Sequence, residues 1–216
     1  MAKTDWYGNC YRQGFKNLGS TPMVGEFDAE ELVTYWKDTG AELVFMNAFF
    51  KRTSLYPSEL TVLDPPLNGR DLVAEFCEAC EKHGMKCGAY VQPQNHWPFM
   101  MDHPEWSQTR TDGTLYGKAP SYSDEPAYWQ ACYNTPYLGR MQELLREIFS
   151  RYRFDAVFVD ETYNREGICH CPSCKARFRE QHGVELPRLD DVADPLYRQA
   201  MQFKYDTFRK GIEGCV

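Results

Sequence analysis

The feature that most limits the fold is a helix pattern followed by a short apolar run, which occurs three times along the chain. The pairs of segments are 27–40 with 41–47, 71–82 with 85–92, and 137–152 with 154–159. In each pair the first segment has apolar residues at helical spacing, and the second is typical of a buried strand. Helices that alternate with strands at this spacing predict parallel strands joined by right-handed crossovers, and therefore an α/β fold.

A further helix is predicted at 195–211 and a short first strand at 6–11, which makes about four strand–helix units in all. Four units are half of an eightfold (β/α)8 barrel, the TIM-barrel type. An open half-barrel would expose apolar strand edges to water. We therefore expect residues 1–216 to form a single, partial barrel domain, as a fragment or a short relative of a larger barrel. Pairing with another half, such as a second copy in a homo-oligomer, and a small open sheet are the alternatives.

The charge balance and the apolar runs argue against several classes of function. The net charge is −7 and no stretch concentrates Lys and Arg, so we expect no nucleic-acid partner. No apolar run approaches the roughly 20 residues of a membrane span, so we expect no membrane partner. The N-terminus lacks the apolar core of a signal peptide, which favours a cytoplasmic protein. No glycine-rich phosphate turn follows a strand pattern, so we expect no organic cofactor.

The apolar run 154–159 ends in two acids, Asp160 and Glu161. The long irregular segments also follow strand patterns: 49–70, 93–134 and 162–187. In α/β proteins the loops after the strands build the active site, so these acids are candidate catalytic groups. Neighbouring side chains on a strand point to opposite faces, so only one of them can point into a barrel. Asp160 is the first candidate and Glu161 the second; the alternative is a cap and a solvated acid.

The cysteine-rich segment 162–187 contains three thiols with the spacing of metal ligands. They are Cys169, Cys171 and Cys174. Clustered thiols in a cytoplasmic chain are more often metal ligands or catalytic groups than disulfides, and four ligands close a structural zinc site. His170 and His182 are candidates for a further ligand, and unmetallated thiols are the alternative. Cys77 and Cys80, one helical turn apart, are interpreted instead as small buried hydrophobes.

Several short segments, taken in their order along the chain, resemble one protein family. They are Leu55-Tyr-Pro-Ser, Gly69-Arg-Asp-Leu, His83-Gly-Met-Lys, His103-Pro-Glu-Trp, Asp112-Gly, Cys132-Tyr-Asn-Thr-Pro-Tyr137, Phe154-Asp-Ala-Val-Phe-Val-Asp160 and Cys169-His-Cys-Pro-Ser-Cys174. The ordered set covers the chain from about Phe27 to Pro187. It resembles the hypothetical glycosyl hydrolases of the family 6-like group, which are (β/α)8-barrel proteins related to α-L-fucosidases and to family 42 β-galactosidases.

The resemblance implies an enzyme that hydrolyses O-glycosidic bonds of a carbohydrate substrate. In the family 42 enzymes a Glu at the end of the fourth strand is the general acid/base, and Glu161 matches it. In the fucosidase-like relatives an Asp at the end of the fourth strand is the nucleophile, and Asp160 matches it. The Asn that precedes the Glu in family 42 is replaced by Asp160 here. The nucleophile that family 42 takes from its seventh strand has no counterpart in the predicted units.

The resemblance also implies a metal site. In family 42 a segment like 132–137 and the later cysteine cluster together bind a structural zinc. The matching residues here are Cys132, Cys169, Cys171 and Cys174. Such a site would be structural, because four thiolates leave no open position on the metal.

Polar and aromatic residues at or after the strand ends are candidates for contact with the sugar. These residues are Asn47, Tyr90, Gln92, His96, Trp97 and Tyr163. Two other functions stay open at this point. One is a non-catalytic carbohydrate-binding or pseudo-enzymatic half-barrel stabilised by zinc. The other is a zinc-stabilised interaction domain without a sugar site.

Overall fold

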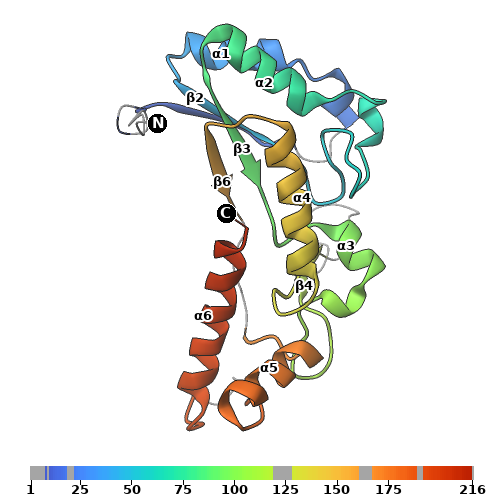
Figure 1. The fold of residues 1–216 in the computed structure, drawn as a ribbon, viewed down its shortest axis with the longest axis vertical. Coiled ribbons are helices and arrows are strands. Elements are labelled where there is room, and N and C mark those ends of the chain that lie inside the picture. The colour runs from blue at the N-terminus through green and yellow to red at the C-terminus, as the bar shows by residue number, and fades with distance from the viewer. Residues whose placement is uncertain are drawn as a thin grey trace. The chain divides into compact units, whose positions relative to one another are not determined.

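A four-stranded parallel sheet forms the centre of one of the two units of the structure (Figure 1). Its strands are β1 (Gln13–Lys16), β2 (Leu43–Asn47), β3 (Lys86–Val91) and β6 (Ala156–Val159), in the spatial order β1-β2-β3-β6. Each strand pairs in parallel with its neighbours, so the predicted α/β class is confirmed. Short apolar runs that are flanked by helix patterns therefore identified β2, β3 and β6 correctly.

The computed structural model describes residues 8, 10–18, 22–118, 128–160, 167–188 and 192–215. The chain divides into two compact units. Unit 1 consists of Met1–Gln92 and Arg146–Asp160, and unit 2 of Pro93–Leu145 and Glu161–Val216. Within the described ranges, no helix is both long and apolar enough to cross a membrane.

Two helices of unit 1 begin at the aspartates that their sequence pattern predicts. Helix α1 (Ala29–Asp38) begins after Asp28, whose side chain accepts a hydrogen bond from the backbone N–H of Glu31 (3.0 Å). Helix α2 (Leu72–His83) begins after Asp71, which caps Ala74 in the same way (2.8 Å). Such caps satisfy N–H groups that have no partner inside the helix. The two helices lie in contact with each other (Figure 1).

The helices α1 and α2 cover one face of the sheet and leave the other face to a set of aromatic side chains. A Cβ added to Gly14 of β1 would overlap the ring of Trp36, which α1 places over that strand. On the opposite face, the rings of Phe15 and Tyr90 lie 4.7 Å apart. Tyr90 and Phe158 are 5.4 Å apart on the same side. Neighbouring residues of a strand point to opposite faces, which explains this separation.

Unit 2 is built mainly from helices and irregular segments. Its helices are α3 (Trp97–Asp102), α5 (Pro172–His182) and α6 (Tyr197–Glu213), with a short antiparallel pair β4 (Gly117–Lys118) and β5 (Tyr128–Trp129). Helix α4 (Tyr137–Arg151) runs from unit 2 into unit 1 and leads to β6, as predicted. The short 3-10 helices are η2 (Pro22–Glu26) and η3 (Pro65–Leu67) in unit 1, and η4 (Pro104–Trp106) in unit 2. The predicted helix at 195–211 is confirmed by α6.

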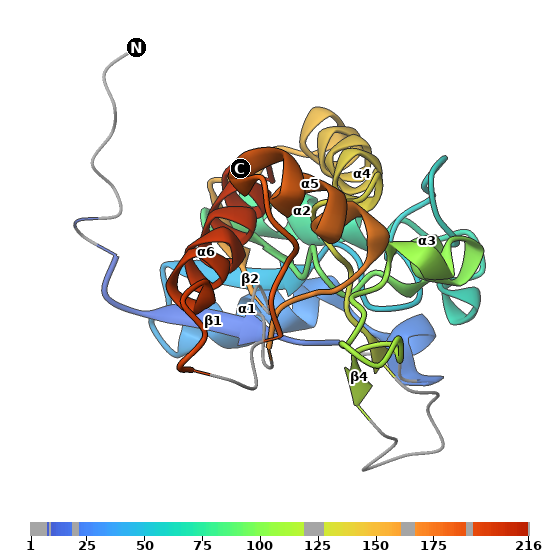
Figure 2. The same ribbon diagram turned by 90° about the horizontal axis from the view of Figure 1, so that it is seen from below.

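Helices α5 and α6 pack side by side through their aromatic residues. The rings of Phe178 and Phe203 meet edge to face at 5.3 Å, and both views show the helices together (Figures 1 and 2). The expectation of an irregular segment over 162–187 was wrong for this helical part. Helix α5 buries only Cys174 and Phe178, so its sequence lacks the regular apolar stripe that reveals a helix.

The first strand does not lie at 6–11, where the sequence predicted it. Cys10 and Tyr11 are outside any strand, and β1 begins at Gln13; residues 6, 7 and 9 lie outside the described residues. The carboxylate of Glu42 instead accepts hydrogen bonds from the backbone N–H groups of Tyr11 (2.7 Å) and Arg12 (3.2 Å). A strand that depends on contacts with residues distant in the sequence has no clear strand pattern in its own residues.

Candidate functional site

The carboxyl ends of three neighbouring strands share one pattern, an aromatic residue followed two positions later by a polar one. The pairs are Phe45 with Asn47, Tyr90 with Gln92, and Phe158 with Asp160. Residues two apart on a strand lie on the same face. In the register of the sheet Asn47 is opposite Tyr90, and Tyr90 is opposite Phe158. The three polar side chains therefore lie on the aromatic face, at the edge where loops leave the strands.

A chain of hydrogen bonds joins Asp160 to β3. The hydroxyl of Tyr90 donates to Oδ2 of Asp160, and Nε2 of Gln92 donates to the Tyr90 oxygen (2.9 Å). The backbone N–H of Asp160 also bonds to the carbonyl oxygen of Val91 (2.9 Å). Tyr90 and Gln92 are buried. Asp160 is thus held from both its backbone and its carboxylate, which keeps an acceptor group in one orientation.

Two buried polar atoms at the same edge have no hydrogen-bond partner among the described residues. Asn47 uses its Oδ1 to accept from the backbone N–H of Leu18 (2.9 Å), but its Nδ2 is unpaired. Oε1 of Gln92 is also unpaired. Unpaired buried groups cost about 1–3 kcal/mol each, so they are rare without a water or ligand to satisfy them. Asn47 therefore offers a donor, and Gln92 an acceptor, at the edge of the sheet that carries Asp160.

Part of the aromatic face is open to solvent. Phe15 is 40% exposed and Phe158 is 44% exposed, although both lie on a sheet face next to buried Tyr90. These rings and Phe45 were not predicted as site residues. The aromatic-x-polar alternation at the strand ends is a signal that could have identified Phe45 and Phe158.

The remaining predicted site residues fall elsewhere. His96 and Trp97 are buried in unit 2, at the start of α3. The backbone N–H of His96 donates to the hydroxyl of Tyr137 (3.1 Å). Glu161 and Tyr163 lie outside the described residues. Within unit 1, the structure brings together Asn47, Tyr90, Gln92 and Asp160.

Unit 2 contains a cluster of four buried thiols whose sulfurs all lie within 4.8 Å of one another. The residues are Cys132, Cys169, Cys171 and Cys174. The sulfur of Cys132 lies 3.3 Å from that of Cys174 and 3.7 Å from that of Cys171. A tetrahedral zinc with Zn–S bonds of about 2.3 Å separates its sulfurs by about 3.8 Å. The four thiols therefore have the ligand type and spacing that a bound metal ion requires.

Local structure explains how the cysteines converge. Cys171 is the residue before α5, and Cys174 lies in the first turn of that helix. The fourth thiol, Cys132, comes from the segment before α4, about forty residues earlier. Neither His170 nor His182 belongs to the group of ligand atoms, so the cysteine alternative is favoured among the described residues.

The thiols of the cluster have pKa values that are shifted in opposite directions. Hydrogen bonds with Cys132, Cys169 and Cys174 lower the pKa of the Cys171 thiol far below its ordinary value. Contact with Cys169, Cys171 and Cys174 raises the pKa of the Cys132 thiol. The backbone N–H groups of Thr109 and Cys171 donate hydrogen bonds to the sulfur of Cys169 (3.4 and 3.5 Å).

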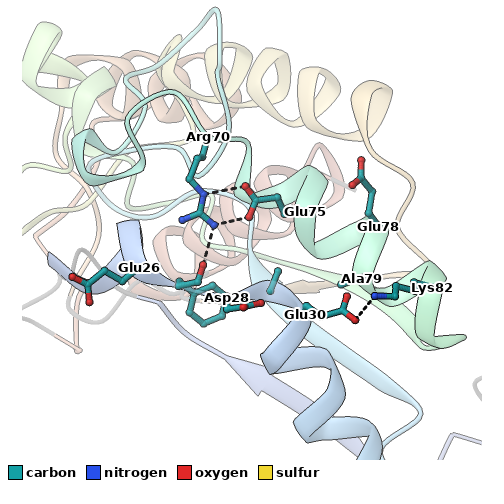
Figure 3. A pocket seen from close by; sticks show the side chains of 10 residues that line it. Glu26, Asp28, Glu30, Arg70, Glu75, Glu78, Ala79 and Lys82 are labelled. Atoms are coloured by element: carbon teal, nitrogen blue, oxygen red, sulfur yellow. Dashed lines mark hydrogen bonds and ion pairs between the residues drawn. The ribbon is translucent and has the colours of Figure 1, made fainter.

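A hollow of unit 1, about 510 Å³ in volume, lies beside α1 and α2 and is lined mostly by charged side chains (Figure 3). Arg70 donates to the Glu75 carboxylate from Nε (3.0 Å) and Nη2 (2.6 Å), and to two backbone carbonyl oxygens before α1 (2.5 and 2.9 Å). Lys82 pairs with Glu30 (2.6 Å). These cations are already engaged in holding α2 to the start of α1, so we regard this hollow as structural.

Comparison with known families and proteins gives one family match. Residues 28–161 match the model of a family described as hypothetical glycosyl hydrolase 6. Among curated proteins, no sequence matches the chain. The matched residues include three of the four strands of the sheet, β2, β3 and β6, together with Asp160.

Several solved structures have a similar fold. They include alpha-L-fucosidase isoenzyme 2 from Paenibacillus thiaminolyticus (19% identity, TM-score 0.73), which is matched over 95% of this chain and 30% of the fucosidase. A beta-galactosidase from the haloarchaeon Halorubrum lacusprofundi is matched over 93% of this chain and 33% of its own (16% identity, TM-score 0.62). A hypothetical protein from Ruminiclostridium thermocellum is matched over 92% and 90% (10% identity, TM-score 0.61). The chain thus spans about a third of the length of both named glycosidases.

Proposed function

Because the chain belongs to the hypothetical glycosyl hydrolase 6 family, we propose that it is part of a glycoside hydrolase that cleaves O-glycosidic bonds of a carbohydrate. The observation that carries the proposal is the Asp160 carboxylate, hydrogen-bonded to Tyr90 at the carboxyl end of β6. Catalytic groups of (β/α)8 enzymes lie at this end of the strands. We further propose that residues 1–216 form a single, partial domain of such a barrel, with β1, β2, β3 and β6 as its first four strands.

Asp160 is proposed to supply one of the two carboxyl groups that glycoside hydrolysis requires. The hydrogen bond from Tyr90 supports this role, because it fixes the carboxylate on the aromatic face. Glu161 remains the second candidate for this one role, because only one of two neighbouring strand residues can point into a barrel. The partner carboxyl group is expected from another part of the full-length protein.

The aromatic face is proposed as the place where the sugar binds. Sugar rings have apolar C–H faces that stack on aromatic rings, and Phe158, two residues before Asp160, supplies such a ring at the carboxyl end of β6. The unpaired Nδ2 of Asn47 and Oε1 of Gln92 suit the hydroxyl groups of a sugar. Tyr90 is a further proposed contact within unit 1. His96 and Trp97, which belong to unit 2, and Tyr163, which lies outside the described residues, stay predictions from the sequence.

The thiol cluster is proposed to bind a structural zinc ion through Cys132, Cys169, Cys171 and Cys174. The donor set supports zinc, because closed four-thiolate coordination is typical of structural zinc sites. Bound zinc would tie the start of α5 to the segment before α4. It would take no part in the reaction, since four thiolates leave no coordination position for water or substrate.

The hydrolase proposal is tested with the full-length protein and a panel of aryl glycosides. We expect Asp160→Asn to reduce turnover by at least about a hundredfold, because a catalytic carboxylate contributes on this scale. Glu161→Gln is the matched comparison on the neighbouring residue. If both variants keep full activity on every substrate that the wild type cleaves, neither acid is catalytic and the proposal is wrong.

One observation favours a second candidate, a carbohydrate-binding protein without turnover. Among the described residues of the strands and of their carboxyl ends, Asp160 supplies the one carboxylate on the face of Tyr90. Calorimetric titration with the same sugars distinguishes the two functions. Binding without hydrolysis by the full-length protein would favour the second candidate, whereas hydrolysis that depends on Asp160 would exclude it.

A further inference from the structure

A second group of thiols, separate from the proposed zinc ligands, lies between a helix and the sheet of unit 1. The sulfur of Cys77, on α2, is 3.5 Å from the sulfur of Cys87, on β3. Cys80 lies one helical turn from Cys77 and also contacts Cys87. The contact between Cys77 and Cys87 therefore joins two elements of the fold, although only the turn around Gly84 separates them in sequence.

The two thiols in contact differ in their access to solvent. Cys77 is partly exposed, whereas Cys87 is 4% exposed and belongs to the interior between α2 and the sheet. Hydrogen bonding to Cys77, and then to Cys80, raises the pKa of the Cys87 thiol. Because Cys77 is the more exposed of the two thiols, a dissolved oxidant reaches it first. In redox-sensor sites an accessible cysteine is oxidised first and a neighbouring cysteine resolves it into a disulfide; Cys77 has the position of the first and Cys87 that of the second.

We propose that Cys77 and Cys87 form an oxidation site that closes into a disulfide when the protein meets a hydroperoxide. In the first step the Cys77 thiolate attacks one oxygen of the hydroperoxide, so that an S–O bond forms while the O–O bond breaks. The other oxygen leaves and is protonated to an alcohol or water, and Cys77 becomes a sulfenic acid. In the second step the sulfur of Cys87 attacks the sulfur of the sulfenic acid. The S–S bond forms, the S–O bond breaks, and the Cys87 proton leaves with the hydroxide as water. The two thiols lose two electrons, and the hydroperoxide gains them.

Geometry favours Cys87 over Cys80 as the partner of Cys77. A disulfide needs its two Cβ atoms about 3.5–4.5 Å apart. Residues three apart on a helix have Cβ atoms about 5–6 Å apart, so Cys77 and Cys80 could join only if α2 were distorted. Cys77 and Cys87 need their sulfurs to approach from 3.5 Å to the bonded distance of about 2.05 Å. The resulting bond would fasten α2 to β3.

Peptide mapping of the full-length protein tests the proposal, which does not depend on the proposed hydrolase function. The protein is treated with hydrogen peroxide at mildly alkaline pH, its remaining thiols are alkylated, and it is digested with trypsin. Cleavage after Arg70, Lys82, Lys86 and Arg110 places Cys77 and Cys80 in the peptide 71–82 and Cys87 in 87–110. We expect these peptides to be joined, with a mass lower by two hydrogens than their sum, and dithiothreitol to separate them.

Three single variants identify which two cysteines form the disulfide. Cys80→Ser is expected to keep the crosslink, and Cys77→Ser to lose it. In Cys87→Ser the sulfenic acid at Cys77 has no resolving thiol, so dimedone should label Cys77 there more than in the wild type. Circular dichroism of Cys77→Ser, a partly exposed position, checks that the fold persists. A crosslink that survives in Cys77→Ser, a Cys77–Cys80 bond within 71–82, or peroxide oxidation of both peptides without any crosslink would each overturn the proposal.

Discussion

The hydroxyl of Tyr90 donates a hydrogen bond to the carboxylate of Asp160, which joins the ends of two neighbouring parallel strands. If Asp160 is catalytic, Tyr90→Phe removes the group that orients it. We expect kcat/KM of the full-length protein for aryl glycosides to fall about tenfold or more, or about 1.4 kcal/mol of transition-state stabilisation. Tyr35→Phe changes an exposed tyrosine on α1 and serves as the control. Equal kinetics for the wild type and Tyr90→Phe would contradict a role for this hydrogen bond in catalysis.

The parts of the fold that depend on local patterns could be predicted from the sequence. Helices α1 and α2 combine apolar residues at helical spacing with the caps Asp28 and Asp71, and both caps form the expected hydrogen bonds. The strand before Asp160 is a short apolar run that ends in an acid, which is a strong signal. These features are set by residues within a few positions of one another.

The parts that depend on distant contacts could not be predicted. Strand β1 contains one large apolar residue, Phe15, and is fixed by Trp36 packing on Gly14 and by the pairing with β2. The contact of Cys77 with Cys87 depends on which side of α2 faces the sheet. The prediction that Cys77 is buried was wrong, since its side chain is partly exposed, whereas Cys80 is buried as predicted. Periodicity indicates that a helix has an apolar side, but it does not identify the atoms that meet across the interface.

The thiol cluster predicts a metal content that can be measured directly. We expect about one zinc per chain in the purified protein by mass spectrometry, and a large loss in Cys132→Ser, because three thiolates bind zinc far more weakly than four. Cys215→Ser is a matched control, since Cys215 is buried in unit 2 but lies outside the cluster. Zinc should also leave on acidification, because protons compete for the thiolates. Full zinc content in Cys132→Ser would contradict the assignment of the fourth ligand.

Glu147 predicts a pH-dependent contribution to stability within unit 1. Its carboxylate accepts hydrogen bonds from the hydroxyls of Tyr56 (2.8 Å) and Ser58 (2.6 Å) and from the backbone N–H of Glu59 (2.8 Å), and it pairs with Arg151 (2.9 Å). Burial raises the pKa of Glu147, but these hydrogen bonds and the Arg151 guanidinium together lower the pKa by more than burial raises it, so the net shift is downward. The ionised form is therefore the one that stabilises the fold.

The sign of the effect follows from that shift. The contribution of Glu147 is fully present above its ordinary pKa of about 4.5 and is lost as the pH falls through the lower pKa of the folded state. We expect Glu147→Gln to lower the free energy of unfolding by about 1–3 kcal/mol at neutral pH and by less in acid, as measured by urea unfolding. Glu143→Gln, at an exposed ion pair on the same helix, should change it by less than about 1 kcal/mol. A deficit that does not shrink in acid would contradict the role of the ionised carboxylate.

The aromatic face predicts a steric effect at Gly88 of β3. The ring of Phe45 lies over this glycine, and a Cβ at position 88 would overlap the ring atoms Cδ1 and Cε1. We expect Gly88→Ala to lower the free energy of unfolding by about 1–3 kcal/mol, because overpacking forces a buried ring out of its position. Phe45→Ala should remove the overlap, so the double variant should be less destabilised than the sum of the two single variants. Gly139→Ala is the matched control, since Gly139 lies in α4 with no atom near its added Cβ and should gain helix propensity. An unchanged urea midpoint in Gly88→Ala would mean that Phe45 does not pack over β3. Phe45 would then not belong to the aromatic face that is proposed to bind the sugar.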